Sequence, residues 1–294
     1  MPSASPIERA ASLACWSSKV DPVPLDGGIT NTNFVIEDHG RRFVVRIGED
    51  IPVHQITRSN ELAASRAAHA AGLSPAVIYA EPGALVLDFI EGRTFTPEDV
   101  RRAENRQALV DLVRRCHNDI PKYFRGPAAI FWVFHVLRDY GHALHEAGSS
   151  HVTVLPRLLS EAQSVESLVG PVEIVFGHND LLAGNFIDDG KRLWLIDWDY
   201  AGFNSPLFDL GGLASNSELD AEAAEDILEL YYGRPVDDGL RRRAAAMTAA
   251  SLLRETMWSM VSEIHSKLAF DYAAYTAENL KRYEAAHAAL RDMT

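Results

Sequence analysis

Short runs of β-branched and aromatic residues mark the first ninety positions, whereas the longer segments beyond them follow a helical period. One early segment, 54–71, is rich in Ala and is followed by Gly72, which predicts a helix closed by a glycine. The remaining hydrophobic runs there are bounded by Gly, Asn and Pro, and they predict strands at 34–36, 43–47, 76–79 and 84–89. The pattern therefore predicts a small sheet with one packed helix.

After Gly92 the pattern changes. Helical periodicity covers 97–117, 130–147, 156–169, 205–232 and 237–292. Short strands are expected in between, at 172–176, 185–187 and 193–196. We place a hinge near 87–93 and predict an α+β fold of two lobes: a β-rich N-lobe at 1–91 and a larger α-rich C-lobe at 92–294.

The composition is that of a globular protein with an excess of acid. Of the 294 residues, 47% are hydrophobic and 23% are charged, and the formal net charge is −13. Such a charge disfavours nucleic-acid binding, which needs concentrated Lys and Arg. It suits a cationic small molecule, because an acidic cleft would concentrate one, but it could equally serve only to keep the protein in solution.

The chain shows no sign of a membrane span or a signal peptide. No apolar run approaches the roughly 20 residues that cross a bilayer. The first six residues lack the basic and apolar regions of a signal peptide, so a cytoplasmic protein is expected. The two cysteines, Cys15 and Cys116, suggest neither a disulfide framework nor a metal site, and we interpret both as reduced, apolar side chains.

The stretch 176–185, FGHNDLLAGN, carries the candidate chemistry together with 194–199, WLIDWD. It places Asp180, Asn185 five residues later, and Asp197 beyond an Asp-Gly turn that favours a tight hairpin. Protein kinases use this order of groups. Phosphoryl transfer needs a carboxylate facing the incoming hydroxyl and hard oxygen ligands for Mg²⁺. We expect Asp180 to be the catalytic base and Asn185 and Asp197 to hold the metal.

A nucleotide would need groups that face its phosphates. The Gly- and Asn-rich turn at 27–33 offers backbone N–H groups and side chains, although such a turn is often only a turn. Arg46 is a charge within a β-branched strand, and Glu61 on the following helix is its expected partner; the alternative is a strand residue facing solvent. The expected nucleotide-binding residues are Gly28, Thr30, Asn31, Asn33, Arg46 and Glu61, with Asp88 and Ile90 in the hinge.

In this order of motifs the chain resembles the kinase-like small-molecule phosphotransferases, which include aminoglycoside phosphotransferases. It is most similar to the choline/ethanolamine kinases, over about residues 20 to 285. The resemblance to that family lies in an Arg at position 46 and in four segments of this chain: 196–202, 208–210, 253–259 and 267–275. The resemblance implies a protein-kinase-like fold and an enzyme that uses ATP and Mg²⁺ to phosphorylate choline or ethanolamine.

The resemblance also implies that Trp258 and a Tyr at 272 or 275 border the acceptor. Independently, a quaternary ammonium is held by aromatic faces and nearby carboxylates, at about 0.5–2 kcal/mol for each cation–π contact. The expected acceptor-binding residues are Asp209, Glu255, Trp258, Tyr272 and Tyr275, although an aromatic stripe on a helix is often only core. Eukaryotic choline kinases carry a second Trp where this chain has Glu255, so a two-Trp cage is not available.

Three functions remain open at this stage. The first is phosphorylation of choline or ethanolamine. The second is a kinase of the same fold that acts on an aminoglycoside, an amino sugar or thiamine; acceptor size separates the two, because a closed aromatic pocket favours choline and an open acidic trough favours an aminoglycoside. The third is a non-catalytic nucleotide-binding protein, which usually lacks the base or a metal ligand.

Overall fold

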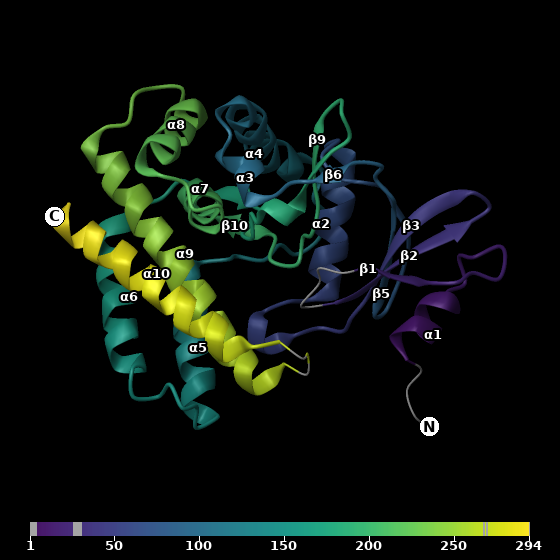
Figure 1. Cartoon of the computed structure of the whole chain (residues 1–294), viewed down its shortest axis with the longest axis horizontal. Helices are drawn as coiled ribbons and strands as arrows, with labels where there is room; N and C mark the ends of the chain where they lie inside the picture. The colour runs from purple at the N-terminus through teal and green to yellow at the C-terminus, as the bar shows by residue number, and fades with distance from the viewer. Residues whose placement is uncertain (1–4, 26–30, 267, 269, 294) are drawn as a thin grey trace.

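The structure is a computed structural model that describes residues 5–25, 31–266, 268 and 270–293. Two expected nucleotide-binding residues, Gly28 and Thr30, lie outside the described residues. An antiparallel sheet built from the N-terminal part stands at one end of the molecule, and helices make up most of the rest (Figure 1). The predicted α+β fold class is confirmed.

The N-terminal sheet has the strand order β1-β2-β3-β5-β4. In β2 the buried side chains alternate, with Phe34 and Ile36 facing a core that also contains Val45 and Val86. The strands are β1 (Val23–Leu25), β2 (Thr32–Asp38), β3 (Arg41–Ile47), β4 (Val77–Glu81) and β5 (Ala84–Asp88). Helix α1 (Pro6–Ala11) precedes these strands, and the short 3₁₀ turn η1 (Pro52–His54) and helix α2 (Arg58–Ala70) lie between β3 and β4.

The predicted helix at 54–71 begins four residues later than expected. Residues 52–54 form the 3₁₀ turn, and Gln55 then takes the left-handed conformation with φ +59°. Thr57 is extended, so the α-helix starts only at Arg58. Its C-terminal end agrees with the prediction, because Gly72 follows at φ +72°.

Helices form the C-terminal region, and three of the long predicted helices are each two helices. The predicted helix at 97–117 is interrupted at Arg102, which is extended, and Asp220 and Asp271 each accept a hydrogen bond from a backbone N–H in the following first turn, so a new helix starts after each of these two inside 205–232 and 237–292. The helices are α3 (Pro97–Arg101), α4 (Ala103–Tyr123), α5 (Val133–Glu146), α6 (Leu155–Val169), α7 (Pro206–Asn216), α8 (Ala221–Tyr232), α9 (Asp238–His265) and α10 (Tyr272–Asp292).

Short strands lie between these helices. The predicted hairpin is confirmed: β8 pairs with β9 through Phe186 opposite Leu195, and the Ile196 N–H donates to the Asn185 carbonyl at 3.0 Å. The strands are β6 (Arg93–Thr94), β7 (Val175–Gly177), β8 (Phe186–Asp188), β9 (Leu193–Leu195) and β10 (Gly202–Asn204), and the 3₁₀ turn η2 (Ala183–Asn185) precedes β8. Asn185 and Asp197 therefore flank one end of the hairpin.

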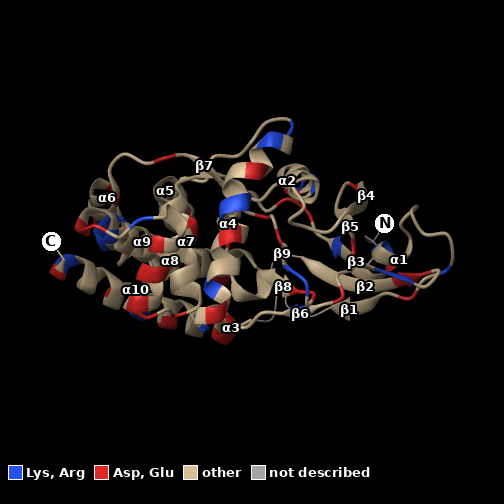
Figure 2. Ribbon diagram, turned by 90° about the horizontal axis from the view of Figure 1, so that it is seen from above, with Lys and Arg blue, Asp and Glu red and all other residues tan. Residues whose placement is uncertain are grey.

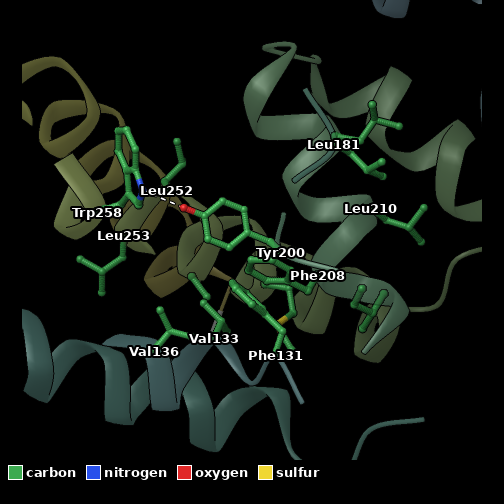
Figure 3. Close-up of a cluster of buried hydrophobic side chains, with 14 of the residues drawn as sticks. Phe131, Val133, Val136, Leu181, Tyr200, Phe208, Leu210, Leu252, Leu253 and Trp258 are labelled. Carbon is green, nitrogen blue, oxygen red and sulfur yellow. Dashed lines mark hydrogen bonds between the residues drawn. The ribbon is translucent and has the colours of Figure 1, made fainter. Parts of the chain in front are cut away.

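Helix α9 lies at the centre of the C-terminal core and packs against α5, α6, α7 and α10. Figure 3 shows Leu252, Leu253 and Trp258 of α9 in a cluster with Phe131 and Tyr200. Charged residues of both signs are spread over the remaining surface (Figure 2). Within the described ranges, no helix has the length and apolarity needed to cross a membrane.

The crossing of α7 and α9 yields a stability prediction. A Cβ added at Gly211 would lie 2.8 Å from the backbone nitrogen of Thr248, whereas one at Gly212 would lie 3.5 Å from the Ser251 hydroxyl. We expect Gly211→Ala to lower the free energy of unfolding by about 1–3 kcal/mol through overpacking. Gly212→Ala, the matched control, should be neutral or stabilise by up to about 1 kcal/mol. Urea denaturation measures both, and equal effects would contradict this packing.

Candidate active site

The loop after β7 presents Asp180, and the residue before Asp180 has a backbone conformation that few residues adopt. Asn179 has φ +65°, in the left-handed region. Its side-chain amide donates to the carbonyls of Tyr200 at 2.9 Å and Gly202 at 3.1 Å. A Cβ on Gly177 would lie 2.6 Å from the Asn179 side-chain oxygen, so this approach requires glycine. The contacts around Asn179 therefore set the direction in which the chain presents Asp180.

Asp209 lies beneath this loop, which corrects the expectation that it meets the acceptor. Its carboxylate accepts the backbone N–H groups of His178 at 2.8 Å and Asn179 at 2.7 Å. Its Oδ2 also lies 2.9 Å from His117 Nε2, and Asp209 is only 2% exposed. Because both oxygens are engaged by the protein itself, Asp209 positions the loop. The sequence signal was a lone carboxylate in the apolar run 207–210, which needs buried donors.

The structure brings Asp180, Asn185 and Asp197 together. The Asn185 side-chain amide donates to the Asp180 carbonyl at 2.9 Å. The hairpin carries the chain to Asp197, which is also left-handed at φ +69°. His178 connects the two segments, because its Nε2 lies 2.9 Å from the carbonyl of Ile196. Two left-handed, non-glycine residues thus occur in the candidate site: Asn179, which precedes Asp180, and Asp197 itself.

Arg46 lies between the sheet and this loop, and it is only 8% exposed. The expected pairing exists: Arg46 Nε is 2.8 Å from a Glu61 oxygen. The same guanidinium reaches Asp197 at 2.9 Å and Asp199 at 3.1 Å. A strand residue facing solvent is therefore excluded, and Arg46 joins β3 and α2 to the segment after β9.

Asp199 is a part of this cluster to which the sequence analysis assigned no role. It pairs with Arg58 at 2.9 Å and accepts a hydrogen bond from Asn31 at 3.3 Å. Burial, together with the neighbouring Asp197 carboxylate, raises the pKa of Asp199 to about 6. The pKa of Asp197 itself lies below its ordinary value, since the Arg46 charge and hydrogen bond outweigh burial. Arg46 thus holds Asp197 in its ionised form.

The nucleotide-side residues are distributed around Arg46. Asn33 lies directly opposite Arg46 in the β2–β3 ladder, and its side-chain oxygen is buried without a hydrogen-bond partner. A cavity between β5 and the segment after β9 is lined by Arg46, Leu87 and Asp197, among others. Asp88 does not join this cluster, because its carboxylate pairs with Arg41 at 2.7 Å. Ile90 is half-buried in the hinge.

On the acceptor side, Glu255 and Asp180 lie on either side of Arg254. The Arg254 Nη1 is 2.9 Å from Glu255 and 3.5 Å from Asp180. Burial raises the pKa of Asp180 to about 7, although the Arg254 charge acts to lower it. The sequence analysis assigned no role to Arg254, but a lone cation after Leu252-Leu253 was the available signal.

The three expected aromatic residues differ in their places. Tyr275 is half-buried, and its hydroxyl donates to Glu255 at 2.8 Å. Trp258 is 4% exposed, and its indole N–H donates to Tyr200 at 2.9 Å (Figure 3). Tyr272 is 6% exposed and donates to Ser266 at 2.8 Å. Tyr275 thus borders Glu255, whereas Trp258 and Tyr272 belong mainly to the packing behind it.

His54 joins the segment before α2 to the wall of this site. Its ring stacks on Trp258 with 5.3 Å between centroids, and its nitrogens lie 3.1 Å from the hydroxyls of Tyr140 and Ser262. Burial lowers the pKa of His54 to about 3, and the Arg254 and His265 charges act in the same direction. His54 is therefore neutral in the folded protein at any mildly acidic pH.

The oxygen ligands suit Mg²⁺ better than a transition metal. Asn185 and Asp197 offer an amide oxygen and a carboxylate, which are hard ligands of the kind that Mg²⁺ prefers. Among the described residues, no three or more His, Cys, Asp or Glu side chains gather as a metal site.

Comparison with known proteins identifies relatives along nearly the whole chain. The model of the choline/ethanolamine kinase family matches residues 23–225. Protein LicA of Haemophilus influenzae is 27% identical over 278 residues, which cover 91% of this chain and 79% of LicA. A crystal structure of a choline/ethanolamine kinase family protein from Mesorhizobium loti aligns with a TM-score of 0.75 and 28% identity, over 97% of both chains. A crystal structure of a LicA protein in complex with AMP aligns with a TM-score of 0.76 and 22% identity, over 97% of both chains.

The buried His54 makes folding stability depend on pH. Its pKa of about 3 lies below the ordinary 6.5, so as pH falls below 6.5 the unfolded chain binds a proton that the folded one excludes. Through His54, lowering the pH from 7 to 5 should therefore reduce the free energy of unfolding by about 2 kcal/mol. We expect the difference in stability between the wild type and His54→Asn to narrow by that amount in urea denaturation.

His145 provides the control for this prediction, because it is an exposed histidine on α5. The substitution His145→Asn should leave the pH dependence of stability unchanged. If the difference in free energy of unfolding between the wild type and His54→Asn stays constant from pH 7 to pH 5, the burial of His54 is contradicted.

Proposed function

This chain belongs to the choline/ethanolamine kinase family, and we propose that it transfers the γ-phosphoryl group of MgATP to the hydroxyl of a small cationic alcohol, either choline or ethanolamine. The observation that carries the proposal is that Asn185 is hydrogen-bonded to the Asp180 carbonyl, while Asp197, just after the second strand of the hairpin, pairs with the buried Arg46. All three groups that phosphoryl transfer needs are present, which argues against a non-catalytic nucleotide-binding protein.

In the proposed reaction, the acceptor hydroxyl loses its proton to the Asp180 carboxylate. The acceptor oxygen forms the new bond to the γ-phosphorus, and the bond between that phosphorus and the bridging oxygen of ADP breaks. Asp180 is suited to this role because its side chain is 20% exposed, and because the Asp209 contacts hold the backbone before it. Positioning, more than covalent chemistry, supplies the rate.

Asn185 and Asp197 would hold Mg²⁺. The bound ion would neutralise negative charge on the phosphates. Arg46 is proposed as the phosphate contact, and its bidentate fork is aligned by Glu61 and Asp199.

For the nucleotide we propose ATP, bound between the sheet and the segment after β9. The LicA structure in complex with AMP supports a nucleotide ligand, and the cavity beside Leu87 and Asp197 supports this placement. Asn31 and Asn33 lie next to Arg46 and Asp199, and we propose that they contact the nucleotide together with Gly28 and Thr30. The hinge backbone at Asp88 and Ile90 would face the base. We keep the division between the lobes at residues 91 and 92, because β5 ends at Asp88 and β6 pairs with β8.

We propose that the acceptor meets Glu255 and Tyr275, with Trp258 and Tyr272 as the packing behind them. Glu255 is the part-exposed carboxylate that lies, with Arg254, beside Asp180. An acceptor with its hydroxyl at Asp180 would therefore have its cationic end within reach of Glu255. Asp209 no longer belongs to this set.

We expect Asp180→Asn to lower kcat by about 10²–10⁴-fold, because the amide cannot accept the hydroxyl proton. The dissociation constant for ATP should change less than about threefold, since Asp180 does not contact Arg46. Coupled ADP release measures the first quantity and calorimetric titration the second. Asp111→Asn, on an exposed position of α4, is the control and should keep full activity. Near-normal turnover of Asp180→Asn would remove its assignment as base.

The acceptor class is tested by ADP release from MgATP with choline, ethanolamine, thiamine and kanamycin. We expect release with choline or ethanolamine and not with the two larger compounds. Release with kanamycin or thiamine alone would overturn the proposed acceptor in favour of another kinase of this fold. Release with none of the four, in a protein that binds ATP, would overturn the proposed kinase reaction on small cationic alcohols.

A further inference from the structure

We propose that the acceptor must carry at least one ammonium N–H and that Glu255 accepts it, so that ethanolamine is used in preference to quaternary choline. This inference rests on the proposed function and concerns the same site. Four observations support it: the polar lining beside Asp180, the covered aromatic faces, the part-exposed Glu255 and the local charge.

The cavity beside Asp180 is lined largely by polar side chains. Asn216, Ser251, Arg254 and Glu255 are among the residues around it. Among the described residues that line this cavity, Phe208 is the one aromatic residue, and Trp258, Tyr272 and Tyr275 do not occur. A trimethylammonium group is held by aromatic faces, whereas an ammonium with N–H groups is held by hydrogen-bond acceptors. The lining is therefore of the second kind.

Three aromatic rings near the site, those of Tyr200, Phe131 and Trp258, are already covered by groups of the protein itself, whereas Tyr275 is half-buried beside Glu255. The Arg254 guanidinium lies 4.2 Å from the centre of the Tyr200 ring and 5.8 Å from that of Phe131. His54 stacks on Trp258 at an interplanar angle of 30°. These three rings thus pack against an internal cation and an imidazole, which leaves Tyr275 as the partly exposed ring beside Glu255. A ligand would have to displace a buried side chain to reach them.

Glu255 retains the capacity to accept further hydrogen bonds. One oxygen accepts the Tyr275 hydroxyl at 2.8 Å, and the other pairs with Arg254 at 2.9 Å. A carboxylate has about four acceptor positions in all, so these two contacts leave capacity on both oxygens. The side chain of Glu255 is 15% exposed, so a small ligand has access to it.

The local charge calls for one cation. Asp180 and Glu255 are both within 3.5 Å of Arg254, so two carboxylates face a single guanidinium. A singly charged ammonium brings the group to neutrality. Coulomb attraction alone would not distinguish ethanolamine from choline, because both carry one positive charge. The distinction comes from the N–H groups, since a site built around a hydrogen bond discriminates against an analogue that lacks it.

The test is a methylation series measured as kcat/KM at saturating MgATP: ethanolamine, N-methylethanolamine, N,N-dimethylethanolamine and choline. Each methyl group removes one N–H and leaves the hydroxyl unchanged. We expect kcat/KM to fall along the series, with a drop of at least tenfold from the dimethyl compound to choline. This last step removes the final N–H.

Glu255→Gln tests the residue itself. We expect a loss of at least tenfold in kcat/KM for ethanolamine, carried mainly by KM, and a smaller loss for choline, which loses only the charge attraction, so that the preference narrows. Glu278→Gln removes an exposed carboxylate on α10 and should leave the series unchanged. An equal loss for all four acceptors would indicate a merely structural Glu255 and would overturn its role.

The wild-type series decides the preference even if Glu255→Gln does not fold. Phosphorylation of choline at a kcat/KM equal to or above that of ethanolamine would overturn the N–H requirement while the proposed kinase function stood. No phosphorylation of any amino alcohol by a folded, ATP-binding protein would instead remove the proposed function, and this inference with it.

Discussion

The buried carboxylate of Asp209 is the constraint on which the candidate active site depends. Through its two oxygens it holds consecutive backbone N–H groups, those of His178 and Asn179, and so stabilises a left-handed residue that would otherwise be strained. His117, from α4, completes the contact. Three separate parts of the chain are thereby fixed around the loop, namely α7, α4 and the segment 200–202, because Asn179 also binds the backbone at Tyr200 and Gly202. The position of Asp180 follows from this network.

Two buried arginines organise the charges on either side of that loop, and each faces more than one acid. Arg46 meets Glu61, Asp197 and Asp199, whereas Arg254 meets Asp180 and Glu255. An excess of carboxylates is costly in a buried setting unless a cation balances it. Around Arg46 the balancing charge would come from Mg²⁺, and around Arg254 it would come from the acceptor. Both proposed ligands are therefore cations for the same electrostatic reason.

Local patterns predicted the parts of this structure that depend on neighbours in sequence. The Asp-Gly turn predicted the β8–β9 hairpin, and a charge within β-branched residues predicted that Arg46 has a partner. Helix ends were predicted less well, because the caps at Asp220 and Asp271 lie inside runs whose period continues across them. The places of Asp209 and Arg254 were missed because they depend on contacts far apart in sequence: Asp209 lies 31 positions from His178. A charge in an apolar run indicates burial but does not identify the partner.

The hydrogen bond between Asn185 and the Asp180 carbonyl explains why an amide occupies this position. A carboxylate of the same size has no N–H to give, and it would add repulsion beside Asp180 and Asp197. The planar amide instead uses its nitrogen to tether the loop and leaves its oxygen for another ligand. In the proposed reaction, one side chain would both tether the loop and coordinate Mg²⁺, and exchange of Asn185 for aspartate would impair the two together.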